Sequence, residues 1–496
     1  MKCARDHSGL AGAAKGRLAG TFHRLGVVCA DRHHFDPADL SQETLGRLSE
    51  SAGLTSRPKL TAGSLAAAFF DRATRTYREA IGKKQKAGAL EGDVRLLFAD
   101  YCDELLRLQA EERAGSPRKD QRVQEDMSCG LAESVLQAMA EGSVEAIDRL
   151  PRVLSLVSRS PTDRLQAVIT RWSAAVPAWM FLRCRHQLVS SLDKHSAICW
   201  QPVVRRLATE YPQAMVYPLR LSGASFDFEK EGTADSCAPF VEELKGKLEV
   251  VDGRVSRLAA AMELLGQRSN AFLDFLLEIG YEAKKKQSRS NQLRPMLEDF
   301  CREVFFVDPG TKRVDFDSYP VEVGQYPRSF VEKYHGPFEK EFGKLGCKIH
   351  DGDLRKSYAQ WQAFAASVVD AKPPLSLEAY SPWFHQTAFD RRFDLEIPGQ
   401  YGGACAERPS PELHARLVGF EDAIELKSSL RRPCVLSMRA SDGAEWPFLL
   451  KAGEDLRQDQ RIQHVQTFVN GLLAEDERCR RRRLRLRTYN VEPLTT

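Results

Sequence analysis

The sequence predicts a mostly α-helical chain, which is followed by a small α+β unit. Three observations support this prediction. Apolar residues recur at helical spacing over most of the chain, and strand alternation is rare between about residues 62 and 235. After Leu395 the pattern changes to short apolar runs separated by turn residues. The 496 residues suffice for two to four packed units.

The composition excludes several classes of protein. Apolar residues make up 43% of the chain and charged residues 28%, as in an ordinary globular protein. The net charge of +4 is too small to indicate nucleic-acid or membrane binding by the chain as a whole. Twelve cysteines without any Cys-x-x-Cys indicate neither a zinc site nor a disulfide framework. Without a run of roughly 20 apolar residues, we expect no membrane contact.

The helical pattern is clearest between residues 62 and 238. One helix face is expected to consist of the following residues: Val94, Leu97, Phe98, Tyr101, Leu105 and Leu108. The next elements are marked by prolines: Pro212 stands where a helix can start, and Pro218 where a helix must end or bend. A second helical block runs from about 239 to 372, and residues 1–61 suggest no fold.

The last hundred residues read as a small β-rich unit with one main helix. Two apolar runs, 434–438 and 446–450, flank Ser441-Asp442-Gly443, which predicts a hairpin. Lys451 follows the second run, and an acidic turn leads into a helical pattern. We expect the apolar face of this helix to consist of the following residues: Ile462, Val465, Phe468, Val469, Leu472 and Leu473.

A lysine at a strand end, followed by acids and a helix, is what the phosphate-binding half of a kinase site needs. The ammonium neutralises phosphate charge, and Glu454 or Asp459 could supply the carboxylate that holds it. The preceding loop, with Ser428, Ser429 and Arg431, could present backbone N–H groups and hydroxyls to phosphate oxygens. The alternative is a solvated, charged helix start, because acids favour a helix N-terminus anyway.

Residues 448–461, Phe-Leu-Leu-Lys-Ala-Gly-Glu-Asp-Leu-Arg-Gln-Asp-Gln-Arg, resemble the lysine strand and following helix of the phosphoinositide 3-kinase-related protein kinases. Residues 395–401, Leu-Glu-Ile-Pro-Gly-Gln-Tyr, and 429–433, Ser-Leu-Arg-Arg-Pro, extend the resemblance. It runs from about residue 90 to the end. The small α+β unit is therefore expected to be a kinase small lobe.

The resemblance implies a domain order. Residues 62–238 correspond to the C-terminal part of a FAT-like helical solenoid, and 239–395 to a helical link with a rapamycin-binding-like insertion. Residues 396–496 correspond to the small lobe of a phosphoinositide 3-/4-kinase-like catalytic domain, and 1–61 stay unassigned.

The resemblance also implies the site residues. Residues 426–432 correspond to the phosphate-binding loop, Leu449 to a wall of the adenine pocket, and Lys451 to the phosphate-binding lysine. Tyr489 corresponds to a strand position that borders the inner pocket. The complete set of expected ATP-binding residues is Ser428, Ser429, Leu430, Arg431, Leu449, Lys451, Glu454, Asp459 and Tyr489.

Catalytic residues are not expected in this chain. The family's Asp-Arg-His-x-x-Asn and Asp-Phe-Gly do not occur after Tyr489, and Asp31-Arg32-His33 lacks the Asn. Nothing would therefore accept the substrate's proton or bind Mg²⁺, so we expect the magnesium ligands in a large lobe and no activity from this chain alone.

The resemblance finally implies a cellular role. ATP is the expected cosubstrate, and the substrates are serine and threonine residues of proteins. The resembled branch of the family acts in the nucleus, at DNA ends with the Ku heterodimer, in double-strand break repair by non-homologous end joining. An alternative is a non-catalytic helical scaffold, or truncated isoform, that binds protein partners.

One basic run stands apart from this resemblance. Residues 478–487, Arg-Cys-Arg-Arg-Arg-Arg-Leu-Arg-Leu-Arg, contain seven arginines. They suit a nuclear-localisation signal or a nucleic-acid patch, but the composition favours a solvated loop of the lobe.

Overall fold

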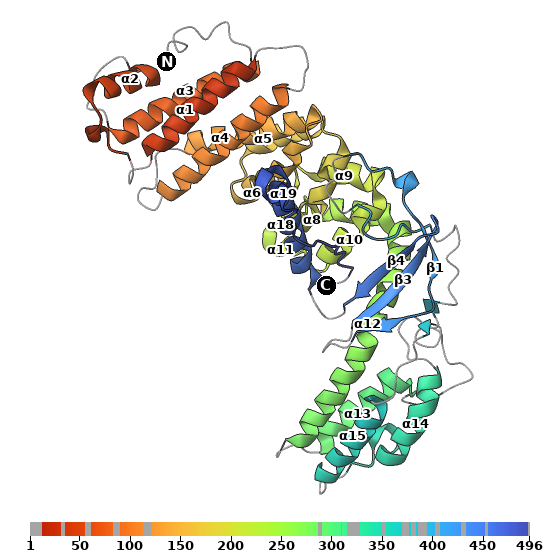
Figure 1. Ribbon diagram of the computed structural model, residues 1–496. Coiled ribbons are helices and arrows are strands. Elements are labelled where there is room, and N and C mark those ends of the chain that lie inside the picture. Colours follow the sequence, from red (N-terminus) through yellow and green to blue (C-terminus); the bar gives the residue numbers. More distant parts are fainter. Residues whose placement is uncertain are drawn as a thin grey trace. The chain divides into compact units, whose positions relative to one another are not determined.

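The computed structural model describes residues 12–30, 35–54, 61–82, 90–112, 121–285, 290–308, 310–314, 328–349, 354–369, 376–377, 383–384, 394–401, 407–427, 433–451 and 455–494. Contacts divide the chain into two compact units (Figure 1). The first comprises residues 1–218, 222–246 and 405–409. The second comprises residues 219–221, 247–404 and 410–496. The described residues form mostly helices and one small sheet, which confirms the predicted fold class.

The helices have the following bounds: α1 Gly12–Ala30, α2 Gln42–Ala52, α3 Ala62–Gly82, α4 Leu90–Glu112, α5 Gln121–Ala140, α6 Leu150–Arg159, α7 Asp163–Ser173, α8 Arg185–Ser190, α9 Gln201–Glu210, α10 Pro212–Gly223, α11 Phe228–Glu231, α12 Ala238–Lys284, α13 Ser290–Phe305, α14 Arg328–Phe342, α15 Leu354–Val369, α18 Leu456–Glu475 and α19 Glu477–Arg481. Short 3₁₀ turns lie at Pro37–Asp39, Glu145–Arg149, Ala178–Cys184, His195–Ala197, Lys344–Gly346 and Pro411–Leu413.

The first unit is built from helices that pack on their neighbours. α1 packs along α3, and α4 along α5. Tyr77, Phe98 and Tyr101 are buried where α3 meets α4, with ring centroids 5.4–6.1 Å apart. The Tyr101 hydroxyl donates to the Phe70 carbonyl at 2.7 Å, which satisfies its polar atom in the core. The predicted apolar face of α4 is buried except at Leu97, which is exposed, and Leu108, which is half-buried.

Two features of this unit go beyond the sequence pattern. No fold is suggested by the sequence of residues 1–61, yet α1 and α2 lie there, and α1 supplies Phe22 and Ala19 to the core. Pro218 lies inside α10, which continues to Gly223, so of the two predicted alternatives the helix does not end there. Leu219 and Leu221 are buried beyond the proline, and their packing offsets the backbone hydrogen bond that a proline removes.

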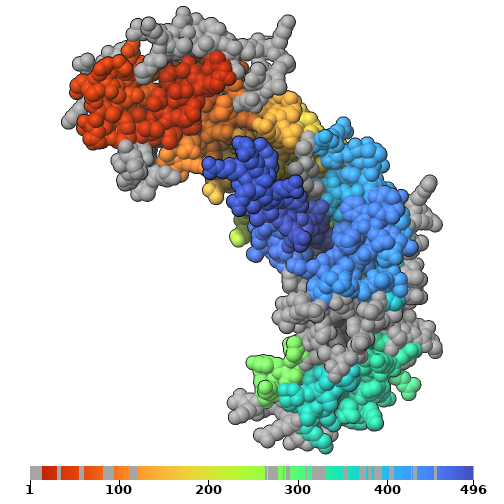
Figure 2. Space-filling view, viewed as in Figure 1, coloured from red at the N-terminus to blue at the C-terminus, as the bar shows by residue number. Residues whose placement is uncertain are grey.

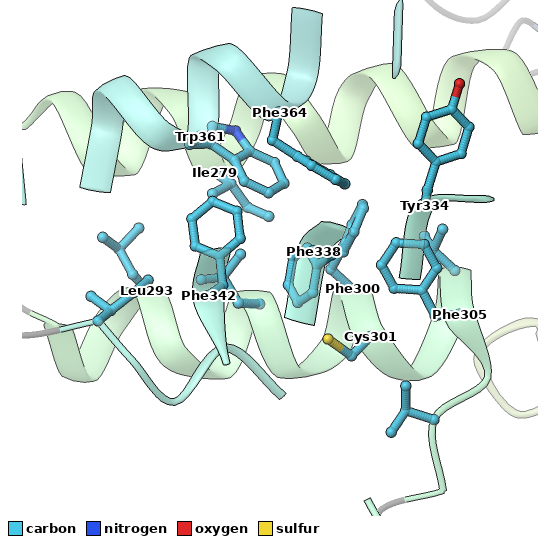
Figure 3. Close-up of a cluster of buried hydrophobic side chains, with 14 of the residues drawn as sticks. Ile279, Leu293, Phe300, Cys301, Phe305, Tyr334, Phe338, Phe342, Trp361 and Phe364 are labelled. Atoms are coloured by element: carbon cyan, nitrogen blue, oxygen red, sulfur yellow. The ribbon is translucent and has the colours of Figure 1, made fainter. Parts of the chain in front are cut away.

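Helices of the second unit enclose an aromatic core. Phe300, Phe305, Phe338, Trp361 and Phe364 come from α13, α14 and α15 and converge as Figure 3 shows. Phe300 meets Phe305 and Trp361 edge to face, at centroid distances of 5.3 and 5.6 Å. Such pairs prefer tilted or edge-to-face geometry because the ring edge is positive and the ring face negative. This core joins helices that are separated by long connections in the sequence.

The sheet is antiparallel and centred on β3. Its strands are β1 Leu417–Phe420, β2 Glu425–Leu426, β3 Cys434–Ala440 and β4 Glu445–Leu450. β4 pairs with one edge of β3, while β1 and β2 share the other edge. The predicted hairpin is confirmed as β3 and β4, and its turn uses Gly443 at φ 80°, a left-handed conformation that suits glycine.

Candidate functional site

The candidate site lies at one end of this sheet. β2 and β3 are connected through residues 428–432, and the Lys427 N–H donates to the Pro433 carbonyl at 3.0 Å. This hydrogen bond holds the two ends of the connection side by side. The expected phosphate-binding loop is therefore bounded by a closed β-hairpin.

The strand register places Lys451 at the same end of the sheet. Leu426 of β2 pairs with Cys434 of β3, and Cys434 pairs on its other side with Leu450 of β4. Lys451 follows Leu450 directly. The lysine therefore leaves the sheet at the level where the β2–β3 connection begins and ends.

Alternation along β4 decides which face the lysine shares. Successive side chains of a strand point to opposite faces, so Leu449 and Lys451 lie on one face and Leu450 on the other. Leu450 is buried, whereas Leu449 is 50% exposed. The two residues expected at an adenine pocket and at a phosphate therefore share the open face of the sheet.

The first turn of α18 supplies the carboxylate for this lysine. Asp455 caps the helix by accepting a hydrogen bond from the Arg457 N–H at 3.1 Å, and it also pairs with the Arg457 guanidinium. The hydrogen bond from the Arg457 side chain lowers the pKa of Asp455 below its ordinary value. The capped turn carries Asp459, whose Oδ2 lies 3.3 Å from Lys451 Nζ.

This ion pair orients the lysine more than it stabilises the fold. Both side chains of the pair are about one-third exposed, and exposed pairs contribute about 0–1 kcal/mol. Of the expected site residues, the structure thus brings Lys451 and Asp459 together and places Leu449 on the same open face. Five others lie outside the described residues: Ser428, Ser429, Leu430, Arg431 and Glu454.

Tyr489 is not in a strand, contrary to the prediction. It is 58% exposed, and residues 484–494 have no ladder partner among the described strands. Its N–H donates instead to the side-chain Oε1 of Gln463 at 3.0 Å. A side-chain amide of α18 thus accepts the hydrogen bond that the Tyr489 N–H would donate to a neighbouring strand in a sheet.

Sequence reasoning missed a row of amide side chains on α18. Gln460 Nε2 donates to the Val491 carbonyl at 3.1 Å. Asn470 binds Leu486 twice, by accepting from its N–H at 2.7 Å and donating to its carbonyl at 3.0 Å. Because Gln463 and Asn470 are seven residues apart, they lie on the same helix face. This amide row holds the extended end of the chain along α18, and the seven-residue spacing is the signal that could have revealed it.

The expected apolar face of α18 is real but not buried. Ile462, Val465, Phe468 and Leu472 are each more than half exposed, while Gln460 and Gln463 are buried. In the described part of the chain, these four side chains of the apolar face therefore lie on the solvent side of α18. The amide row takes the inner side of the helix because it satisfies the backbone of the extended segment.

The described residues contain no group of three or more His, Cys, Asp or Glu side chains placed to hold a metal ion. Among the described helices, none has both the length and the apolar character required to cross a membrane.

Comparison with known proteins identifies the class. The chain is 30% identical to the DNA-dependent protein kinase catalytic subunit of Xenopus laevis over 496 residues, which covers 97% of this chain and 11% of that protein. It is 31% identical to the corresponding protein of Gallus gallus over 492 residues, with the same shares covered. A solved structure described as the FAT and kinase domain of CtTel1 matches 98% of this chain and 31% of its own length, with 16% identity and a TM-score of 0.44. No protein-family model matches the chain.

The chain belongs to the phosphoinositide 3-kinase-related protein kinase family. The two relatives above are DNA-dependent protein kinase catalytic subunits, and the chain spans about one-ninth of their length. The similarity covers more of the chain than the stretch from residue 90 onward that the sequence motifs indicate.

Proposed function

We propose that the chain carries the phosphate-binding half of the ATP site of a serine/threonine protein kinase. The observation that supports this most directly is the pair of Lys451 and Asp459, which lies at the end of the sheet where the β2–β3 connection closes. Lys451 would bind a phosphate oxygen, and Asp459 would hold the ammonium in place. A fixed ammonium is favourable for phosphate because it needs no reorganisation on binding.

The adenine would lie against the open face of the sheet. Leu449 shares that face with Lys451 and offers apolar surface. Ser428, Ser429, Leu430 and Arg431 belong to the connection that leads into β3, and Glu454 to the turn before α18. Their proposed role rests on the family resemblance and on this position in the sequence.

The family resemblance assigns the magnesium ligands to a large lobe. The 496 residues also lack the expected Asp-Arg-His-x-x-Asn and Asp-Phe-Gly. The chain alone should therefore bind ATP weakly and transfer no phosphate.

The relatives' name supports a role that depends on DNA. The whole protein would phosphorylate protein serine and threonine residues in the nucleus. It would act at DNA ends with the Ku heterodimer in non-homologous end joining.

Differential acylation of lysines tests the ATP half-site. Each lysine of the 496-residue chain is modified with an amine-reactive reagent, with and without millimolar ATP, and its rate is measured by mass spectrometry. ATP should slow modification of Lys451 severalfold, because phosphate covers its ammonium. Lys245 is the matched control, since it is also exposed and also paired with a carboxylate, that of Glu242.

Two further measurements test whether the protection depends on phosphate and on Asp459. Adenosine should leave Lys451 reactive because it has no phosphate, and Asp459→Asn should weaken the protection by ATP. If ATP changes the rates of Lys451 and Lys245 equally, the proposal is wrong and the scaffold alternative takes its place.

A further inference from the structure

Residues 478–487, here called the arginine segment, form a dense and exposed patch of positive charge. All seven of its arginines are exposed to solvent. Figure 2 shows this end of the chain in dark blue as part of the molecular surface. The seven are Arg478, Arg480, Arg481, Arg482, Arg483, Arg485 and Arg487.

Most of this charge is not neutralised by the described part of the chain. Arg481 pairs with Glu477, and Arg480 donates to the Ala474 carbonyl at 3.4 Å. The remaining five arginines have no carboxylate partner among the described residues. A cluster of like charges without counter-charges is unfavourable by itself and is relieved when a polyanion binds.

The backbone of the arginine segment is held in place at both ends. Asp476 caps α19 by accepting from the Cys479 N–H at 2.8 Å. After the helix, the Leu484 N–H donates to the Cys479 carbonyl at 3.0 Å. The Asn470 side chain then forms two hydrogen bonds with the backbone of Leu486. The arginines therefore extend from a defined surface, which lowers the entropy cost of ordering them on a ligand.

The helix dipole explains the position of only some of these arginines. Cations favour the last turn of a helix, which covers Arg478, Arg480 and Arg481 of α19. Arg485 and Arg487 lie beyond the helix in the extended segment, where no dipole acts.

We propose that the arginine segment binds the phosphate backbone of a nucleic acid. Duplex DNA carries a charge about every 1.7 Å along its axis and releases condensed counterions when cations bind it. An extended acidic peptide carries at most one charge per residue, about every 3.4 Å, so it matches this density of guanidinium groups less well. α19 has only five residues, too short to read a major groove. The binding is therefore independent of base sequence, and it is a property beyond the proposed ATP half-site.

Fluorescence anisotropy of the 496-residue chain with labelled random-sequence duplex DNA tests this proposal. The cluster variant replaces Arg482, Arg483, Arg485 and Arg487 with alanine. It should bind DNA at least tenfold more weakly at low salt. The slope of log K against log salt should fall by about 0.9 for each phosphate that the variant no longer neutralises, thus by roughly 3 to 4.

Two matched variants distinguish the effect of charge in the arginine segment on DNA affinity from the effect of the chain's total charge. One replaces the exposed cations Arg47, Lys245, Lys285 and Arg302 with alanine, which removes the same four charges elsewhere. It should change the affinity less than twofold. The other converts the four cluster arginines to lysine, and it should keep binding within a few-fold because phosphate accepts either cation.

Three outcomes would overturn the proposal. The first is an equal loss of affinity in the cluster variant and in the variant that removes charges elsewhere. The second is unchanged affinity in the cluster variant with its helical circular dichroism intact. The third is displacement of DNA by polyglutamate at equal charge concentration, which would assign the segment to acidic proteins. Equal binding of duplex RNA would support recognition of phosphates alone.

Discussion

Single residues of the small lobe carry more than one physical role. Lys451 is positioned by strand register and then oriented by Asp459 from a different element. Arg483 combines charge with an unusual backbone, since its φ is 52°. Its N–H donates to the Arg480 carbonyl at 3.0 Å, while the next N–H reaches Cys479. These two bonds define the motif that closes a helix with a left-handed residue, usually glycine.

Replacing Arg483 with glycine should therefore stabilise the fold. A side chain in the left-handed region costs about 1–2 kcal/mol, and the greater freedom of glycine in the unfolded chain returns part of this. We expect a net gain of about 0.5–1 kcal/mol in the free energy of unfolding, measured by urea denaturation.

The matched control for this prediction is Arg482→Gly. It removes the same charge at a position with φ −83°, where glycine has no advantage. The control should be neutral or destabilising. A stabilisation of both variants by the same amount would point to relief of charge repulsion and not to backbone strain.

Whole elements show where amphipathic reasoning succeeds. In α4, apolar spacing identified the buried face, since Phe98 and Tyr101 are both in the core. In α18, the same reasoning identified an apolar face that is exposed, because amide side chains bind the extended segment on the other side. Apolar periodicity reports that a helix has two faces, but the partner available to each face is a tertiary property.

The helices around the aromatic core contain a group that is sensitive to pH. His335 of α14 lies against Phe305, with ring centroids 5.5 Å apart. Burial lowers the pKa of His335 below its ordinary value of 6.5, and the charge of Glu339 opposes this shift. The folded state thus disfavours the protonated imidazole, and the unfolded state binds more protons below about pH 6.5.

The core around His335 should consequently lose stability as the pH falls. Its contribution is complete above about pH 6.5 and is lost as the pH decreases through the folded-state pKa. The melting temperature of the chain should decrease between about pH 7.5 and 5.5. In His335→Gln this decrease should be smaller. Burial also lowers the pKa of His23 in α1, so some acid sensitivity should remain. If His335→Gln is as acid-sensitive as the parent chain, burial of this imidazole is not the cause.

At the scale of the whole molecule, apolar surface on α18 sets the behaviour in solution. Ile462, Val465, Phe468 and Leu472 follow one another at helical spacing and are all exposed. Contiguous apolar surface of this kind marks an interaction site or an aggregation hazard. Under the proposed function, it is the surface that would face the rest of the catalytic domain.

The chain should therefore self-associate through this face. Val465→Glu with Phe468→Glu should reduce light scattering at high protein concentration without lowering the melting temperature, because both side chains are already exposed. Val250→Glu is the control, as a charge placed on a single exposed side chain that is 70% accessible. If Val250→Glu reduces scattering equally, added charge and not the apolar face explains the effect.

The class of this protein was indicated by the resemblance of residues 448–461 and of the motifs upstream of them to a known family. Local patterns in the sequence determined its helical and β-rich parts, the β3–β4 hairpin and the expected lysine. These features follow from short-range spacing and turn chemistry, which are independent of distant contacts. Only the tertiary structure decided that Asp459 reaches Lys451, that Gln463 and Asn470 hold the extended segment, and that the apolar face of α18 stays exposed. Each of these depends on which surfaces meet in the folded chain. The pattern of apolar and polar residues along the sequence does not determine these tertiary contacts.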